Sequence, residues 1–334
     1  MKPYWQISAS GTATRALRRA LGGFGFVAIL ASPLAHATSY TFATIDPAGA
    51  TWVRASGIND SGVITGWYDD GSGHYDAFLD TGGHYTTLSV PGNTGLNQAD
   101  GINNNGVVAG TYSSSTGWLG FTESNGSYTT VNVPSSVDTM AYGINDNGAV
   151  VGLYQDSVGS QHGYLDTNGS YTSLDVPGAL DVTDARGINR SGTIVGYYRD
   201  VGFAWEGFVY KNGSYTALNV PFAGANNTVL YGINNNGVIV GSYIDGSYGH
   251  GFIDNAGVFT SFDVPFAGAS NTKIFGINDN GVVVGEYAVG TAMYGFSATP
   301  VPEPHALLQM GLGLALLGFL RRRRITGLTV PADR

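Results

Sequence analysis

The sequence has 334 residues, of which 51 are glycine and 20 are tyrosine, while only 12% are charged and none is cysteine. This composition indicates a turn-rich β protein rather than a helical enzyme, and the lack of cysteine excludes disulfides and thiolate metal sites. The stretch from Thr38 to Pro300 carries six basic and 22 acidic residues. Its net charge of −16 argues against nucleic-acid binding, which needs a basic surface.

The N-terminus has the pattern of a secretory signal peptide. Basic residues precede an apolar run over residues 20–31, and Ala35 and Ala37 stand where signal peptidase reads small residues. We therefore expect residues 1–37 to be removed, so that the mature chain begins at Thr38. The alternative is a packed helix with a proline near its end.

Six copies of Gly-Ile-Asn follow at spacings of 42 to 45 residues. A period in the forties is typical of a four-stranded propeller blade or of a pair of helices. Apolar and polar residues alternate in short runs separated by Asn-Gly and Ser-Gly, and no run has a helical length or period, which indicates strands. The first glycines of the six copies are Gly57, Gly101, Gly143, Gly187, Gly232 and Gly276.

Each repeat divides into four predicted strands. In the fifth copy, the first strand ends in Gly-Ile-Asn, and the next three cover about residues 238–243, 249–254 and 258–265. The first two strands are joined by Asn-x-x-Gly, which favours a type I turn with a left-handed glycine. A second glycine recurs inside each second strand, and we expect an aromatic side chain of the adjacent blade to pack over it.

The two ends of the repeat region complement each other. The last repeat lacks a fourth strand, whereas residues 39–47, before the first repeat, match the fourth-strand pattern of residues 170–177. We predict an all-β fold, a six-bladed β-propeller of four-stranded antiparallel blades over residues 38–300, whose last blade is closed by the N-terminal strand. The alternative is an open solenoid, whose mismatched ends would need caps.

A second targeting pattern occupies residues 301–324. Val301, Pro302, Glu303 and Pro304 are followed by 15 mostly apolar residues, 306–320, and then by four arginines. As a helix this apolar part is about 22 Å long, shorter than the hydrocarbon core of about 30 Å, so a span needs snorkelling arginines and a thinned bilayer. The arginines should stay cytoplasmic, with residues 325–334 as a cytoplasmic tail. The four are Arg321, Arg322, Arg323 and Arg324.

The order of motif, apolar helix and basic cluster resembles the PEP-CTERM sorting signal of Gram-negative bacteria that make extracellular polysaccharide. The resemblance implies an exosortase, a membrane protease-transpeptidase that recognises the motif and releases or transfers the protein. A plain C-terminal anchor is the alternative. The repeats resemble the HAF-type extracellular repeat, which implies an extracellular protein and no established reaction. The segments nearest to its His-Ala-Phe are Asp76-Ala-Phe78, His162-Gly-Tyr164 and His250-Gly-Phe252.

The loops that follow each second strand and those that connect the repeats differ between copies, whereas the Asn-x-x-Gly turns are nearly alike. Antiparallel strand order places the variable loops on one face, and variable loops on a rigid scaffold are where recognition is expected. We interpret seven residues of this face as candidate binding contacts: Trp52, Asp69, His74, Trp118, Asp184, Trp205 and Tyr248.

The sequence gives little support to catalysis. Neither a Gly-x-Ser-x-Gly elbow nor a His-x-x-x-His pair occurs, and two of the histidines, His162 and His250, share one repeat position. Segments such as Asn145-Asp-Asn-Gly echo part of a calcium loop but lack its alternating ligands and closing glutamate. We interpret them as turns and predict no catalytic residue, no metal and no cofactor, with calcium as the alternative.

We therefore predict a secreted or surface-displayed scaffold, a non-catalytic binding or structural protein of the exopolysaccharide or biofilm matrix. Its expected partners are signal peptidase, an exosortase, and exopolysaccharide or matrix proteins, but no nucleic acid. The C-terminal helix would hold it transiently in the inner membrane before processing. The alternative is a polysaccharide-acting enzyme, a glycoside hydrolase or lyase with a site at the channel mouth.

Overall fold

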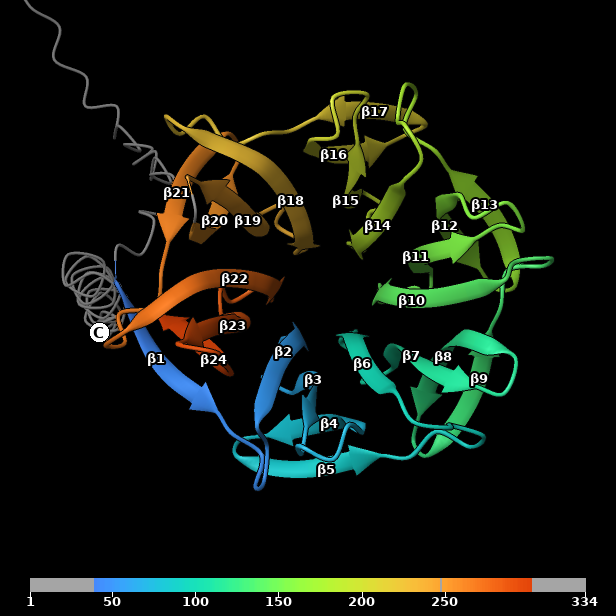
Figure 1. Ribbon diagram of the computed structural model, residues 1–334, viewed down its shortest axis with the longest axis horizontal. Coiled ribbons are helices and arrows are strands. Elements are labelled where there is room, and N and C mark those ends of the chain that lie inside the picture. Colours follow the sequence, from blue (N-terminus) through green and yellow to red (C-terminus); the bar gives the residue numbers. More distant parts are fainter. Residues whose placement is uncertain (1–38, 247, 302–334) are drawn as a thin grey trace, which may run out of the picture. The chain divides into compact units, whose positions relative to one another are not determined.

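Twenty-four β-strands make up the part of the chain that the computed structural model describes, residues 39–246 and 248–301 (Figure 1). The predicted all-β fold of four-stranded antiparallel sheets is confirmed. The expected signal peptide with Ala35 and Ala37, the sorting residues from Pro302 to Arg324 and the tail after them lie outside this part. Within residues 39–246 and 248–301, no helix is long and apolar enough to cross a membrane.

Each of the six repeats contributes a first and a second strand of similar length. The first strands of the six repeats converge on one axis (Figure 1), and they are β2 (Trp52–Ile58), β6 (Asn97–Ile102), β10 (Asp138–Ile144), β14 (Thr183–Ile188), β18 (Ala225–Ile233) and β22 (Ala269–Ile277). The second strands are β3 (Ile64–Asp69), β7 (Val108–Ser114), β11 (Val150–Gln155), β15 (Ile194–Arg199), β19 (Ile239–Asp245) and β23 (Val283–Val289).

The remaining strands lie farther from the axis (Figure 1). The third strands are β4 (Tyr75–Thr81), β8 (Gly117–Ser124), β12 (Gln161–Thr167), β16 (Trp205–Lys211), β20 (Tyr248–Asn255) and β24 (Ala292–Pro300). The outermost strands are β1 (Tyr40–Ile45), β5 (His84–Leu88), β9 (Ser127–Val131), β13 (Ser170–Leu174), β17 (Ser214–Ala217) and β21 (Val258–Phe262).

The sheets follow the sequence repeats. Strands β6–β9, β10–β13, β14–β17 and β18–β21 form four separate four-stranded sheets. The other eight strands form one sheet, because a single parallel bridge between Trp52 and Met293 connects β2–β5 to β22–β24 and β1. The predicted order of four antiparallel strands in each repeat is thus observed.

The first strand of the described chain pairs with the last. β1 runs antiparallel to β24, with Tyr40 opposite Pro300 and Ile45 opposite Gly295. The backbone N–H of Val301 extends this pairing by donating to the carbonyl of Ser39 at 3.0 Å. The residues before the first repeat therefore pair with the third strand of the last repeat, which lacks a fourth strand in sequence order.

The glycine inside each second strand faces an aromatic ring of its own sheet. Gly66 lies directly opposite Phe78 of β4, and a Cβ at Gly66 would lie 2.7 Å from that ring and 2.1 Å from the carbonyl oxygen of Arg54. The expectation that the ring comes from the adjacent blade is wrong. The antiparallel register already places the two residues side by side, and the same arrangement recurs in the other repeats.

The hydrophobic core lies between neighbouring sheets rather than inside one. Phe121 is fully buried and packs in one cluster with Ala99 and Val108 of its own sheet and with Ala77 and Leu88 of the preceding one. Equivalent clusters follow around the chain. Each repeat therefore depends on its neighbours for burial, as in other repeat architectures.

Candidate functional site

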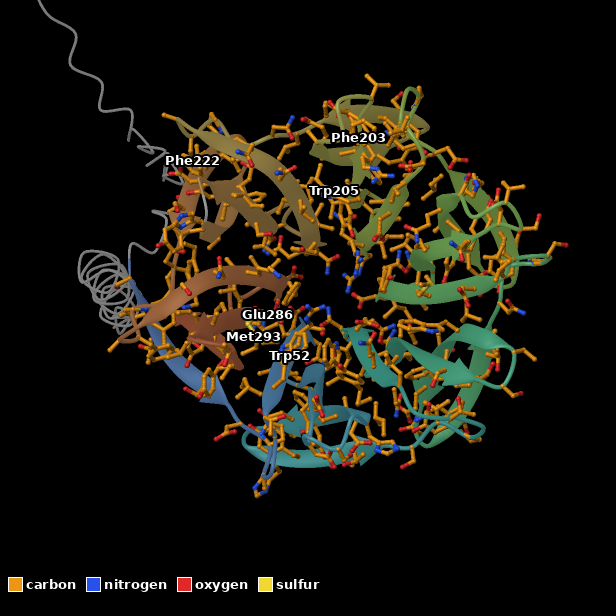
Figure 2. All side chains as sticks on the ribbon, in the orientation of Figure 1. Trp52, Phe203, Trp205, Phe222, Glu286 and Met293 are labelled. Atoms are coloured by element: carbon orange, nitrogen blue, oxygen red, sulfur yellow. The ribbon has the colours of Figure 1, made fainter. Side chains whose placement is uncertain are left out.

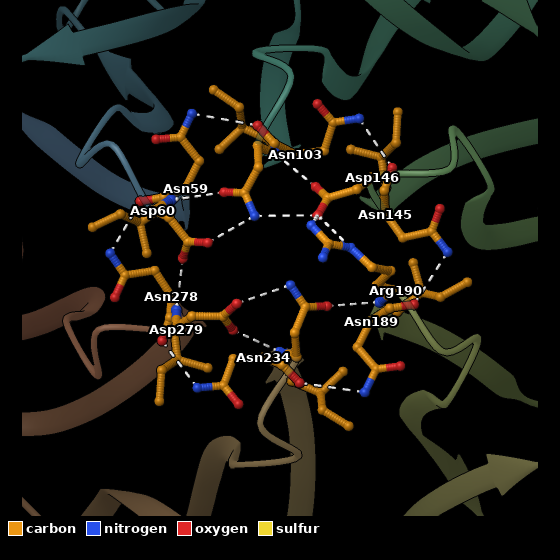
Figure 3. Close-up of a pocket in the computed structure, with 18 residues that line it drawn as sticks. Asn59, Asp60, Asn103, Asn145, Asp146, Asn189, Arg190, Asn234, Asn278 and Asp279 are labelled. Atoms are coloured by element: carbon orange, nitrogen blue, oxygen red, sulfur yellow. Dashed lines mark hydrogen bonds and ion pairs between the residues drawn. The ribbon is translucent and has the colours of Figure 1, made fainter.

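The asparagine of Gly-Ile-Asn links each repeat to the next (Figure 3). The side-chain amide of Asn59 donates to the backbone carbonyl of Asn103, and Asn103 donates in the same way to Asn145. The series continues through Asn189 and Asn234, and it returns from Asn278 to the carbonyl of Asn59 at 3.0 Å. These bonds are 2.9 to 3.3 Å long and the donors are buried, so this asparagine is structural.

The same asparagine builds the turn that follows it. The Oδ1 atom of Asn145 accepts hydrogen bonds from the N–H groups of Asn147 and Ala149, both at 3.0 Å. Gly148 closes the turn with a φ of 81°, which confirms the predicted left-handed glycine. In the segment that echoes a calcium loop, Asn145 therefore uses its oxygen on the turn's own backbone, while the carboxylate of Asp146 accepts hydrogen bonds from Asn104 and Arg190 of the neighbouring repeats. Among the described residues, no group of three or more acidic or histidine side chains is placed to hold a metal ion.

A β-bulge places one variable residue of every repeat in the central channel. The register of the first strand shifts just before Gly-Ile-Asn, for example between Ala141 and Gly143, so that the residue between them is left unpaired. These residues form a layer across the channel: Ser56, Asp100, Tyr142, Arg186, Tyr231 and Phe275. The cavities beside them measure about 40 and 90 Å³, enough for a few water molecules and too small for a sugar.

Arg186 is the centre of one charged cluster in this layer. Its guanidinium donates to Asp184 at 2.7 Å and to the hydroxyl of Tyr197 at 3.0 Å, and it lies 3.8 Å from the ring centre of Tyr142. Burial lowers the pKa of Arg186, but Asp184 and the surrounding tyrosines together outweigh burial and raise the pKa above its usual value. In the same layer, burial raises the pKa of Asp100 to about 7, because the charges of Arg186 and Arg54 offset only part of the desolvation.

A second charged cluster connects the channel with the variable-loop face. Glu286 of β23 is fully buried and accepts hydrogen bonds from Arg54 at 2.9 and 3.2 Å and from Lys273 at 3.2 Å. Burial would raise the pKa of Glu286, but the two cations outweigh it and hold the pKa below its usual value, so the carboxylate is ionised. Two positive charges thus surround one negative charge.

A groove of about 550 Å³ opens on the variable-loop side, between the sheets of β14–β17, β18–β21 and the last repeat. Figure 2 shows Trp205 and Met293, which both line it, on either side of β18 and β22. This volume is within the range of small-molecule sites. Its aromatic residues are Tyr197, Trp205, Tyr231, Tyr243 and Tyr248.

Two asparagines at equivalent repeat positions supply polar groups to the groove. Asn227 and Asn271 have left-handed backbones, with φ of 50° and 51°, next to register shifts in β18 and β22. Their Oδ1 atoms accept hydrogen bonds from the N–H groups of Trp205 at 3.0 Å and Gly249 at 2.8 Å. The amide of Asn271 therefore presents its N–H₂ as the part that can donate to a ligand.

The structure brings two of the seven candidate residues together. Trp205 and Tyr248 line the same groove, and Tyr248 is 61% exposed. Asp184 is not a loop residue but lies in β14, is 2% exposed and pairs with Arg186. Asp184 is therefore not the exposed loop contact that the sequence predicts, and its partner Arg186 donates to Tyr197, which lines the groove.

The other four candidates lie outside the groove. Trp52 is half-buried against Trp67, with ring centres 5.4 Å apart. Asp69 accepts from the N–H of Gly71 at 2.8 Å and so shapes its own loop. His74 is exposed and bonds to Ser72.

Trp118 is 37% exposed in β8. Its backbone N–H donates to Asp138 at 2.7 Å. Trp118 has the same side chain as Trp205 but belongs to another repeat and does not line the groove, which makes it a matched control.

The two histidines that share a repeat position make equivalent hydrogen bonds to an aspartate. The Nδ1 atom of His162 is 2.7 Å from Asp175, and that of His250 is 2.9 Å from Asp263. Each imidazole also stacks on the tyrosine opposite it, Tyr154 or Tyr243. Such pairs stabilise the sheet surface, and among the described residues they place no nucleophile beside the imidazole.

Sequence reasoning missed most of the groove, including Tyr197, Tyr231, Asn271 and Lys273. One signal was present, because the residue before each Gly-Ile-Asn differs between copies while its neighbours barely change. A side chain that varies inside a uniform repeat does not take part in the packing that all repeats share. In this chain the varying side chains line the channel.

Comparisons with known proteins give a likeness of fold. No family model matches the sequence, and no curated protein matches it. The SapL1 lectin in complex with alpha methyl fucoside is similar in structure, with a TM-score of 0.50 and 10% identity over 76% of this chain and 98% of that chain.

TolB from Acinetobacter baumannii has a TM-score of 0.49 and 13% identity, over 75% of this chain and 65% of that chain. The Aleuria aurantia lectin in complex with Fucalpha1-6GlcNAc has a TM-score of 0.47 and 13% identity, over 77% of this chain and 99% of that chain. At 10% identity, the likeness to the SapL1 lectin is one of fold alone, a propeller-like arrangement of antiparallel sheets.

Proposed function

We propose that residues 38–300 form a six-bladed β-propeller in which β1 completes the last blade. Three observations support this: the sheets follow the six repeats, β1 pairs with β24, and the asparagine series returns from Asn278 to Asn59. An open solenoid would leave the first and last repeats without this contact. A closed ring leaves no exposed sheet edge at its ends.

We infer that this scaffold is a carbohydrate-binding protein without catalytic activity of its own. The observation that carries the proposal is the groove of about 550 Å³, walled by Trp205 and four tyrosines and edged by the amides of Asn227 and Asn271. Aromatic faces pack on the apolar face of a pyranose ring, and a few fixed amides orient its hydroxyls. The channel, with cavities of 40 to 90 Å³, is too narrow for this role.

The alternative, a polysaccharide-acting enzyme, has less support. Glycoside hydrolysis uses two carboxyl groups on either side of the bond that is cleaved. No aspartate or glutamate is among the residues that line the groove in the described part of the chain. Asp100, whose pKa is about 7, lies in the channel layer where a sugar does not fit.

The proposed setting is the cell surface or the exopolysaccharide matrix. The signal-peptide pattern of residues 1–37 and the PEP-CTERM pattern of residues 301–324 support export and exosortase processing. The intact mass of the surface-associated chain tests this. A mass that still includes both patterns would contradict processing.

Retention of the full chain on the producer's own polysaccharide tests the binding proposal. We expect Trp205→Ala and Tyr248→Ala each to lower retention about tenfold, since each removes one aromatic wall. Trp118→Ala is the matched control and should retain normally. Equal retention of all variants would refute the groove, while shortening of the polysaccharide chains would favour the enzyme.

A further inference from the structure

The groove lacks negative charge although the chain around it is strongly acidic. None of the residues that line it, as the described part of the chain places them, is an aspartate or glutamate. The stretch from residue 38 to 300 has 22 acidic side chains, so the composition of the chain does not account for a groove lining without carboxylates. Among the described residues that line the groove, Lys273 is the one cation.

The charge of Lys273 is not cancelled locally. Its ammonium shares the carboxylate of Glu286 with Arg54, so the three side chains together carry a net charge of about +1 at neutral pH. Arg54 takes the bidentate position on Glu286, at 2.9 and 3.2 Å, and is held between the rings of Trp67 and Phe275. Lys273 makes the single contact, at 3.2 Å, and its side chain is 36% exposed.

The surplus positive charge therefore faces the groove. An ammonium has three donors, and Lys273 uses one of them on Glu286. Two donors stay available to a ligand, beside the N–H₂ of Asn271 and the aromatic walls. A partly buried cation with spare donors is matched best by an anionic oxygen group, because a charge-assisted hydrogen bond is about twice as strong as a neutral one.

We propose that the ligand of this groove is an acidic sugar, a uronic-acid residue whose carboxylate pairs with Lys273 while its ring packs on Trp205 or Tyr248. This inference rests on the proposed carbohydrate-binding function and names the class of sugar. Lys273 acts as the specificity-determining residue. Glu286 and Arg54 position it, since they hold its ammonium at the edge of the groove.

Binding of uronate oligosaccharides to the full chain tests the inference. Oligomers of guluronate, mannuronate, galacturonate and glucuronate are titrated calorimetrically, each beside its carboxyl-reduced neutral form. We expect at least one uronate to bind about tenfold more tightly than its reduced form, with affinity that falls as salt rises. Lys273→Gln should remove this preference for the charged form, while Lys273→Arg should keep it.

A second variant separates a charge effect from a folding effect. Glu286→Gln removes the only negative charge of the three side chains, so uronate affinity should rise a few-fold, an increase that a merely damaged fold does not produce. Melting temperatures of all variants establish that they are folded. Equal binding of charged and reduced sugars would overturn the acidic-sugar inference alone. Binding of neither form, together with normal polysaccharide retention by Trp205→Ala, would overturn the proposed function as well.

Discussion

Asp100 shows how one position of a uniform repeat acquires its own chemistry. The bulge before Gly-Ile-Asn points its carboxyl into the channel, where one oxygen is buried without a hydrogen-bond partner among the described residues. Burial disfavours the ionised form and raises the pKa to about 7, and the repulsion from Asp184 adds to this. The same bulge carries serine, tyrosine, arginine or phenylalanine elsewhere.

Asp100→Asn tests this pKa through stability. The folded-state pKa of about 7 lies above the usual value of 3.8, so folded Asp100 holds its proton longer than unfolded Asp100. The stability that the aspartate contributes is therefore lost as pH rises from about 4 to 7 and is constant above that. Relative to the wild type, the variant should gain about 2–4 kcal/mol between pH 4.5 and pH 8 in urea unfolding. Parallel pH profiles of the two proteins would contradict the assignment.

Lys273 and Trp205 show the same principle on the groove side. Neither residue belongs to the repeat pattern, since the positions equivalent to Lys273 carry Arg54, Gln98, Met140, Asp184 and Val229. Their repeat neighbours fix where the backbone runs. The side chains at these two positions can therefore differ between repeats without changing the backbone, and can be ones that contact a ligand.

The element that repeats is a strand, a bulge and an asparagine turn. A Cβ at Gly143 would lie 2.6 Å from the carbonyl oxygen of Arg186 and 3.3 Å from the Cα of Gly187, so the first strands approach more closely than alanine allows. The asparagine that follows then satisfies the neighbouring backbone. Glycine and asparagine are thus both required where the first strands meet.

Asn145→Ala measures how much this turn contributes to the free energy of unfolding. The variant loses three hydrogen bonds, at 3.0 to 3.1 Å: the N–H groups of Asn147 and Ala149 lose their acceptor, and the carbonyl of Asn189 loses one of its two donors. We expect a loss of about 2–4 kcal/mol in the free energy of unfolding by urea. Asn147→Ala removes one exposed bond to the carbonyl of Arg190, so this control should lose less than about 1 kcal/mol. Equal effects would mean that the asparagine series adds nothing.

At the scale of the whole molecule, the decisive contact joins β1 to β24, whose register partners lie 250 to 260 positions apart. β1 buries Ile45 at the junction and lays Tyr40 and Phe42 against Phe262. Loss of this strand would expose that aromatic cluster and the edge of β24 together. The contact is also what distinguishes a closed ring from an open array of repeats.

A disulfide between β1 and β24 tests the closure, because the natural chain has no cysteine. Thr41 and Thr299 are exposed register partners, so Thr41→Cys with Thr299→Cys should oxidise readily. Constraining so long a loop should raise the free energy of unfolding by about 2–4 kcal/mol over the reduced form. Thr41→Cys with Thr172→Cys, a threonine of β13, should not crosslink. A failure of the first pair to form under oxidation would argue for an open solenoid.

The strands, the turns and the strand that pairs with the last repeat could be predicted from the amino-acid sequence. Strands and turns follow from alternation and from Asn-x-x-Gly, which are properties of neighbouring residues, and the pairing follows from comparing residues 39–47 with the fourth strands of the other repeats. The sequence did not predict that Trp205, Tyr248 and Lys273 line one groove or that Asp184 is buried, and both are seen only in the folded chain. Such contacts join residues about 25 to 70 positions apart, and they depend on how the sheets stack rather than on any local pattern.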